Sequence, residues 1–156
     1  MLAATPSRLA NLTEGLPAAQ LLVPPDPGEW SARDVGECTH SAHLRACADM
    51  WGMYIGVILS LDEPTYKAVN PTTWIKHTNY REQEFQPLFD AFTAQRTELL
   101  ALLMPLPPEA WSRMATVMTA GKPRIRTVHT YGEWLVNHER AHFRQFEHSV
   151  NTVLHA

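Results

Sequence analysis

The chain has 156 residues, the length of one domain, and we interpret residues 1–156 as a single domain. Hydrophobic residues make up 45% and charged residues 19%, which predicts an ordinary buried core and excludes wholesale disorder. The net charge of −3 argues against a protein that works by neutralising nucleic-acid phosphate. Apolar runs are too short to cross a bilayer and no secretory signal pattern begins the chain, so we expect a cytoplasmic protein with no nucleic-acid or membrane partner.

The distribution of proline divides the chain. Because proline breaks helix interiors, stretches without it are the natural places for long helices. Such stretches cover residues 28–63, 88–104 and 124–156. Near the N-terminus, the spacing of Leu9, Leu12 and Leu16 indicates a further, shorter helix.

The first long helix is predicted after Ser31, whose hydroxyl is a good N-cap. Its apolar stripe recurs every three or four residues, at His43, Cys47, Met50, Tyr54, Val57 and Leu61. Gly52 and Gly56 weaken this helix but let a neighbouring helix approach closely. Cys38 and Cys47 would lie on opposite faces, about 13 Å apart along the axis, so we expect no disulfide and a reducing compartment.

The second long helix is predicted over about residues 80–103, beginning or kinking near Pro87, and the third over about residues 127–154. The apolar stripe of the second contains Phe85, Phe89, Phe92, Leu99 and Leu103; that of the third contains Tyr131, Leu135, His138, His142, Phe146 and Val150. Residues 115–128 fit a small hairpin or an irregular loop. Long links around the second long helix permit a crossover, so the predicted fold class is an all-α four-helix bundle with a long crossover connection.

Two of the histidines lie in the interior stripe of the last helix. His138 and His142 are four residues apart, so both side chains leave the same face one turn apart and can bind one metal ion. The alternative is a pair of hydrogen-bonded histidines in the core or at its rim, without a metal. A shared ion would satisfy one nitrogen of each imidazole, and an unsatisfied buried group costs about 1–3 kcal/mol.

The segment around these histidines, His138-Glu139-Arg140-Ala141-His142, also matches the H-E-x-x-H pattern of zinc proteases. In that pattern a glycine lets the chain turn back toward a third histidine, and here the position is Gln145. On a continuous helix His148 lies about 120° around from His142, beyond the reach of a shared ion. We therefore reject the protease interpretation.

A third ligand is available on the first long helix, where His43 lies in the apolar stripe and His40 one turn before it. Two histidines from one helix and one from a facing helix are a normal way to build a metal site inside a bundle. Three neutral nitrogen ligands leave a coordination position open, which is typical of a catalytic rather than a structural site.

Several sequence motifs occur together between residues 28 and 146. The segment 44–52 after His43, together with Trp134-Leu135-x-x-His138-Glu139-Arg140-x-His142, resembles the DinB-like superfamily. Three further motifs are similar to one bacterial subgroup: Trp30-Ser31, Asn70-Pro71-x-Thr73-Trp74-Ile75 and Phe92-x-x-Gln95-Arg96. Each motif is moderately specific, and their order and joint occurrence are much more so.

The resemblance implies a four-helix bundle with one long crossover and a divalent metal held by one histidine of the second helix and two of the fourth. Carried over position by position, the ligands are His43, His138 and His142, with His40 as the alternative or accessory ligand. Family members with assigned roles include metal-dependent transferases and isomerases that use low-molecular-weight thiols such as bacillithiol or mycothiol. A homodimer is also expected from the family.

Other residues near these motifs receive simpler interpretations. Cys47 can face the metal, but we interpret it as a small buried hydrophobic residue. Glu139 points about 100° away from His138 on a helix, which favours a solvated or ligand-supporting position. Core packing is expected for Tyr131 and Trp134, although Tyr131 can also reach a substrate.

The segment between the first two long helices is a plausible cover for a pocket. Trp74 and Tyr80 are its candidate lid residues. Three arginines near the last helix, Arg126, Arg140 and Arg144, can attract an anionic substrate, although a solvated face is the simpler interpretation.

The leading functional hypothesis is a metal-dependent enzyme of the thiol S-transferase type, acting on a small molecule together with a low-molecular-weight thiol. Zinc or nickel is the expected ion and iron is compatible, because three imidazoles suit all of them. The alternatives are a metal-dependent hydrolase and a non-enzymatic, metal-binding or dimerising stress-related bundle. The sequence identifies no catalytic residue besides the metal ligands.

Overall fold

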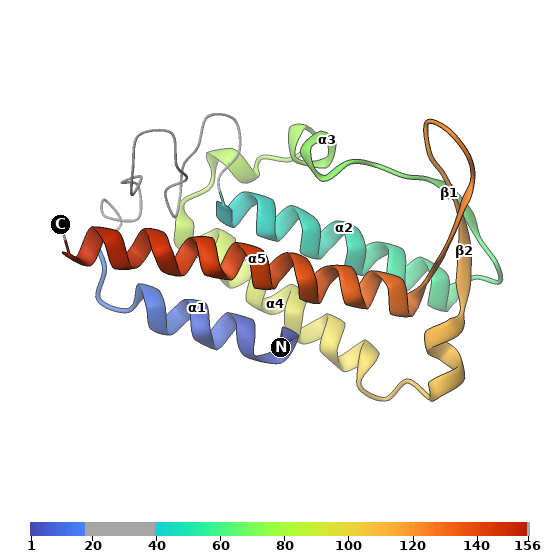
Figure 1. The fold of residues 1–156 in the computed structure, drawn as a ribbon, viewed down its shortest axis with the longest axis horizontal. Helices are drawn as coiled ribbons and strands as arrows, with labels where there is room; N and C mark the ends of the chain where they lie inside the picture. Colours follow the sequence, from blue (N-terminus) through green and yellow to red (C-terminus); the bar gives the residue numbers. More distant parts are fainter. Residues whose placement is uncertain (18–39, 156) are drawn as a thin grey trace.

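The computed structural model describes residues 1–17 and 40–155, and its long helices lie side by side (Figure 1). The bundle consists of α1 (Thr5–Thr13), α2 (His40–Ser60), α4 (Phe85–Leu103) and α5 (Val128–His155). The shorter helical segments are η1 (Leu2–Ala4), α3 (Pro71–Lys76), η3 (Tyr80–Glu82) and η4 (Pro108–Ser112). The strands are β1 (Thr65–Lys67), β2 (Met114–Met118) and β3 (Arg124–Thr127).

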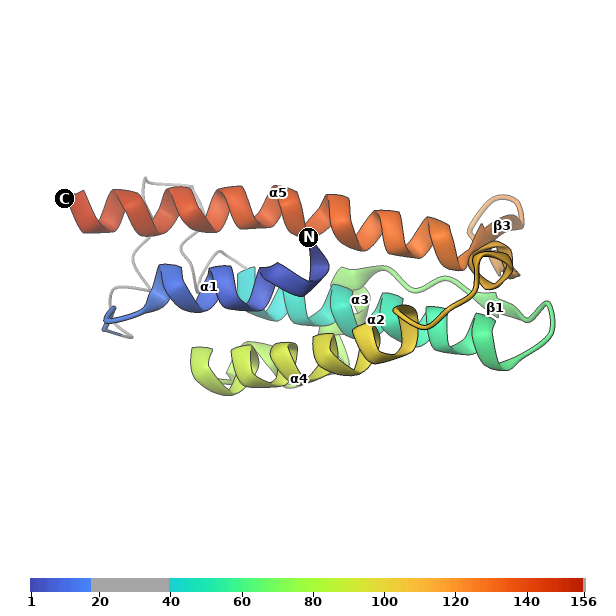
Figure 2. The ribbon, with the colours of Figure 1, turned by 90° about the horizontal axis from the view of Figure 1, so that it is seen from below.

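The four main helices pack as a square, and helices that follow one another in the sequence do not always pack against each other. α2 packs against both α4 and α5, and α1 packs against the same two helices. α2 and α4 run in the same direction, whereas α1 and α5 run the opposite way (Figures 1 and 2). The connection from α2 to α4, residues 61–84, must therefore return along the bundle. This arrangement confirms the predicted four-helix bundle with a long crossover.

A small sheet lies at the end of the bundle where α2 ends and α5 begins (Figure 1). β2 pairs with β3 in antiparallel fashion and with β1 in parallel, giving the order β1-β2-β3. The alternating side chains Ala115 and Val117 of β2 are buried, as expected for a sheet with one covered face. Of the two alternatives for residues 115–128, the hairpin is correct. The strand β1 is an addition that the sequence analysis did not predict.

Helix boundaries follow local chemistry. α5 begins one residue after Thr127, whose Oγ1 accepts a hydrogen bond from the Thr130 N–H at 3.1 Å and so caps the helix. α4 begins at Phe85, which places Pro87 in the first turn, where a missing backbone N–H costs nothing. The predicted segment 80–103 is therefore divided into η3 and α4. α1 ends at Thr13, shortly before Gly15 adopts a positive φ of 75°.

The interior consists of two apolar clusters along the bundle axis. The cluster nearer the sheet contains Met50, Tyr54, Ile55, Ile58, Leu99, Leu103, Ala115, Val128, Tyr131 and Leu135. The other contains Leu9, Leu44, Ala48, Phe92, Phe143, Phe146 and Val150. The predicted stripe of α2 is correct as far as Tyr54, Val57 is half-buried, and Leu61 is wrong. Ile58 is fully buried, whereas Leu61 follows the helix end and is 54% exposed.

The two glycines of α2 differ in their surroundings. A Cβ atom at Gly52 would meet the Gln95 side-chain nitrogen of α4 at 2.5 Å, so this glycine permits the predicted close approach. Apart from its chain neighbours and the adjacent backbone of its own helix, no atom in the described part of the chain lies within 4 Å of such an atom at Gly56, so there the prediction is wrong. The predictions for Ser31 and Cys38 lie outside the described residues. None of the helices in the described ranges combines the length and apolarity that a membrane span requires.

Candidate metal centre

α2 and α5 pack against each other, and each contributes two side chains one turn apart to a common cluster. α2 provides His43 and Cys47, and α5 provides His138 and His142. The ring centroids of the three histidines lie 5.0 Å (His43–His138), 4.9 Å (His43–His142) and 4.3 Å (His138–His142) apart. The structure thus brings together the three histidines that the sequence singled out.

The donor atoms of this cluster are closer still. The Nε2 atoms of His43 and His138 lie 3.0 Å apart. The Cys47 Sγ lies 3.6 Å from the His43 Nε2 and 3.5 Å from the His138 Nε2. Among the described residues, His43, Cys47 and His138 each offer one ligand atom, and these three atoms lie within 4.8 Å of one another, close enough to hold one metal ion. Cys47 is buried, as expected, but its sulfur faces the histidines rather than only apolar neighbours.

Burial sets the charge of the two closest imidazoles. Desolvation lowers the pKa of His43 below its ordinary value of 6.5. Desolvation, together with repulsion from His43, lowers the pKa of His138 to about 4. Both side chains are therefore neutral at pH 7, and the neutral imidazole is the form that binds a metal.

The donor set fits a divalent first-row ion. Imidazole nitrogens suit zinc, nickel, iron and copper. Two nitrogens that lie about 2.0–2.1 Å from one zinc ion are about 2.8–3.4 Å apart in octahedral or tetrahedral geometry. The observed distance of 3.0 Å between the Nε2 atoms of His43 and His138 lies within that range. His40 is the first residue of α2, and its side chain lies outside the described residues.

Aromatic side chains continue from the cluster to the surface. The Trp51 ring meets the His138 ring edge-on at 5.1 Å and lies 6.1 Å from the Trp134 ring. The Arg126 guanidinium stacks over Trp134 at 4.7 Å. Trp134 is 38% exposed, so the prediction that it belongs to the core is wrong. Arg126 is half-buried on Trp134 rather than part of a solvated face, whereas Arg140 and Arg144 are exposed as expected.

The crossing segment is anchored to the bundle through tyrosines. Tyr66 of β1 donates a hydrogen bond to the Tyr131 hydroxyl oxygen at 3.1 Å and stacks on Tyr54 at 4.6 Å. Tyr131 is 2% exposed, so its predicted core position is correct. Tyr80 donates to the Asp49 Oδ2 of α2 at 2.6 Å.

Trp74, the other predicted lid residue, lies on α3. It packs against the apolar cluster nearer the sheet. Both candidate lid residues therefore contact the α2 side of the bundle.

Glu139 is neither solvated nor directed at the histidines. It is 2% exposed and forms an ion pair with the Arg96 Nη2 of α4, which is 1% exposed. The Nε and Nη1 atoms of Arg96 and the Oε2 atom of Glu139 have no hydrogen-bond partner within the described ranges. The sequence interpretation of Glu139 is wrong because the face of α5 beside His138 lies over the bundle centre, where Arg96 reaches it.

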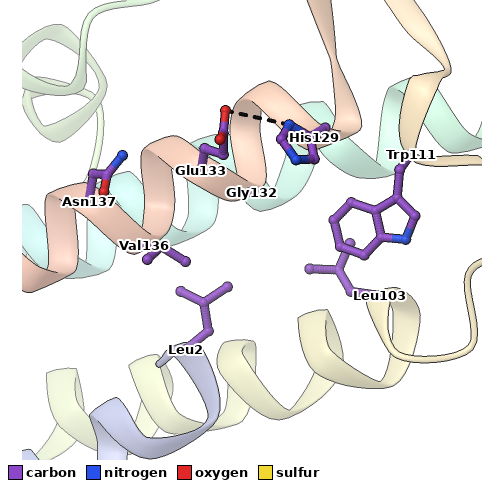
Figure 3. Close-up of a pocket in the computed structure, with 8 residues that line it drawn as sticks. All are labelled: Leu2, Leu103, Trp111, His129, Gly132, Glu133, Val136 and Asn137. Atoms are coloured by element: carbon purple, nitrogen blue, oxygen red, sulfur yellow. Dashed lines mark ion pairs between the residues drawn. The ribbon is translucent and has the colours of Figure 1, made fainter. Parts of the chain in front are cut away.

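A cleft of about 330 Å³ lies between α5 and residues of η1, α4 and η4 (Figure 3). Leu2, Leu103, Trp111 and Val136 form its apolar lining. His129 contacts the Glu133 carboxylate across one helical turn at 3.4 Å. On α5 the cleft residues recur at 129, 132, 133 and 136, half a turn away from the face that holds His138 and His142.

Comparison with models of protein families identifies the family to which the chain belongs. The family model of the DinB superfamily matches residues 1–146. The chain belongs to the DinB superfamily. The match includes α1, α2, α4 and the part of α5 that carries both histidines of the cluster.

Among solved structures, this DinB superfamily member is similar to YfiT from Bacillus subtilis, described as a probable metal-dependent hydrolase with an unusual four-helix bundle topology. The two share 17% sequence identity with a TM-score of 0.72, over 97% of this chain and 81% of YfiT. This likeness confirms the fold. The comparison with curated proteins gives no match.

Proposed function

We propose that the chain is a metal-dependent enzyme whose divalent ion is held by His43, His138 and His142. The observation that carries the proposal is the convergence of three imidazoles from α2 and α5, with ring centroids 4.3–5.0 Å apart. Zinc or nickel suits this donor set best, and iron is compatible with it. The description of YfiT, a protein of the same fold, as a probable metal-dependent hydrolase supports the proposal.

Hydrolysis of a small-molecule substrate is the reaction proposed first, because the description of YfiT supports it. A divalent ion lowers the pKa of a water molecule or a thiol and so supplies a nucleophile near neutral pH. The protein keeps His43 and His138 neutral through burial. Trp51 and Trp134 offer apolar surface beside His138, and Arg126 offers a positive charge to a substrate anion.

Thiol S-transfer is the second candidate. It is supported by the motifs around residues 43–52 and 134–142, which resemble the DinB-like superfamily, some of whose members use low-molecular-weight thiols. In this reaction a low-molecular-weight thiol would replace water as the nucleophile. The aromatic surface beside His138 then accepts the electrophilic partner.

Both candidates are tested with chelator-treated protein to which zinc or nickel is added back. One assay offers esters and amides in water, and a second offers thiols together with an electrophile. We expect turnover in one assay that disappears on chelation, returns with metal and is absent in His138→Ala. His148→Ala is the matched control, because His148 is an exposed histidine of the same helix. Turnover that survives chelation or the His138 substitution would contradict the proposal.

A further inference from the structure

We propose that Cys47 is a fourth protein ligand of the metal centre. The inference rests on the proposed function, because it requires an ion held by the histidines. A thiolate from α2 would then join the imidazoles of His43, His138 and His142, so that each of the two helices contributes a pair of ligands one turn apart.

The distances around the Cys47 sulfur carry the inference. Zinc binds imidazole nitrogen at about 2.0–2.1 Å and thiolate sulfur at about 2.3 Å. At tetrahedral angles, a sulfur and a nitrogen on the same ion are therefore about 3.5–3.6 Å apart. The Cys47 Sγ lies 3.6 Å from the His43 Nε2 and 3.5 Å from the His138 Nε2. Both distances agree with a shared ion.

The position of Cys47 also suits a ligand. It is 1% exposed and lies one turn after His43 on the face of α2 that packs against α5. A cysteine that only fills apolar space is surrounded by apolar groups, whereas the Cys47 sulfur lies beside two imidazole nitrogens. The competing explanation is a thiol that donates a hydrogen bond to a neutral imidazole, which gives similar distances but keeps the proton on sulfur.

Coordination by Cys47 would replace the proton on its sulfur with the metal ion. The thiol S–H bond breaks, its proton goes to solvent, and a sulfur–metal bond forms without any oxidation or reduction. A soft thiolate favours zinc over magnesium or manganese, which narrows the choice of ion. Four protein ligands would leave fewer positions open on the ion, so a nucleophile would bind as a further ligand or displace Cys47.

Cobalt(II) loaded into the chelator-treated protein tests the inference. Its visible d–d bands report that the ion is bound, and a near-ultraviolet sulfur-to-cobalt charge-transfer band reports a thiolate ligand. The variants are Cys47→Ser and Cys47→Ala, each checked for helical content by circular dichroism. Cys38→Ser is the matched control, because it leaves Cys47 as the single cysteine of the chain.

We expect the charge-transfer band in the wild type and in Cys38→Ser, and its loss in both Cys47 variants, with metal affinity reduced about 10-fold or more. Visible bands without the charge-transfer band in the wild type would overturn the role of Cys47 and leave the histidine site intact. A charge-transfer band that persists in Cys47→Ser would overturn it as well. Failure of the wild type to bind cobalt at all would overturn both this inference and the proposed function.

Discussion

His43 and His138 lose the solvent that stabilises protonated imidazole, and burial lowers the pKa of both side chains. In the unfolded chain the same imidazoles titrate near pH 6.5. The pKa of His138 in the folded protein is about 4. Between these two values the unfolded chain binds a proton that the folded protein excludes.

We therefore expect the free energy of unfolding of the metal-free protein to fall as the pH is lowered from about 6.5 toward 4. Above about pH 6.5, His138 is neutral in both the folded and the unfolded protein, so it no longer lowers the free energy of unfolding. The contribution of His138 to the slope is at most about 1.4 kcal/mol per pH unit. Urea denaturation at a series of pH values measures it, and His138→Gln should show a shallower slope. Equal slopes in the two proteins would contradict the expected burial effect.

The residues of the cluster are predictable from the sequence to different degrees. The four-residue spacing of His138 and His142 and the position of His43 in an apolar stripe are enough to indicate a shared site. Cys47 in the same stripe is typical of a core residue, because buried cysteines usually have no ligand role. The signal that could have revealed it is its spacing of one turn from His43, the same spacing that pairs the histidines of α5.

Glu139 is not predictable in the same way. Its partner Arg96 lies 43 residues earlier in the chain and on another helix. Helical periodicity places a side chain on a face but does not say which helix covers that face. Long-range pairing of this kind follows from the packing of the bundle.

Among the structural elements, α2 and α4 meet at a glycine that leaves room for a side chain of α4. Gln95 of α4 donates a hydrogen bond from its side-chain amide to the Ala48 carbonyl oxygen of α2 at 2.8 Å. The same amide nitrogen occupies the space that a Cβ atom at Gly52 would need. A larger residue at Gly52 therefore competes directly with this contact between helices.

The two glycines of α2 form a matched pair for mutagenesis. Gly56→Ala should raise the free energy of unfolding by about 1 kcal/mol, because alanine favours the helix and meets no neighbour in the described ranges. Gly52→Ala gains the same propensity but displaces the Gln95 amide, which costs about 1 kcal/mol for the lost hydrogen bond. In thermal denaturation, the melting temperature of Gly56→Ala should thus be higher than that of the wild type. The melting temperature of Gly52→Ala should be clearly lower than that of Gly56→Ala. Equal melting temperatures of the two variants would contradict the close approach at Gly52.

Long helices are easier to predict from the sequence than short strands. The helices α4 and α5 extend over enough residues for a regular apolar stripe, and the start of α5 is marked by the capping residue Thr127. The strand β1 has only three residues and pairs with β2, about 50 residues later in the chain. No local pattern identifies so short a strand, because its stability comes from its partner.

In the molecule as a whole, Arg96 and Glu139 join the two helices on one diagonal of the bundle. α4 and α5 each pack mainly against α1 and α2, so the ion pair spans the centre between them. Two buried charges in such a place stabilise each other, and the loss of one leaves the other without compensation.

Arg96→Met should therefore lower the free energy of unfolding by about 3–5 kcal/mol, because the Glu139 carboxylate would remain buried and unpaired. The double variant Arg96→Met with Glu139→Leu should recover most of this loss, since no buried charge remains. Urea denaturation of the wild type, both single variants and the double variant gives the coupling energy. A double variant as unstable as the sum of the two single variants would show that the charges do not act as a pair.

Metal binding should stabilise the whole bundle, because the proposed ligands come from two helices that separate on unfolding. At a free metal concentration of about 1000 times Kd, linkage contributes about 4 kcal/mol. For a domain of this size that corresponds to a rise in Tm of about 8–16 °C. Scanning calorimetry with zinc, and again after chelation, measures the shift. A Tm that does not respond to zinc in wild-type protein would contradict a site shared by α2 and α5.

The central claim is that His43, His138 and His142 hold one divalent ion, and metal content tests it most directly. Protein purified without an affinity tag should contain about one first-row ion per chain by elemental analysis, or take up one at neutral pH. The His142→Ala variant should lose it, whereas the exposed-site control His148→Ala should retain it. Wild-type protein that holds no ion even after reconstitution would contradict the claim and make the cluster a structural feature of the bundle.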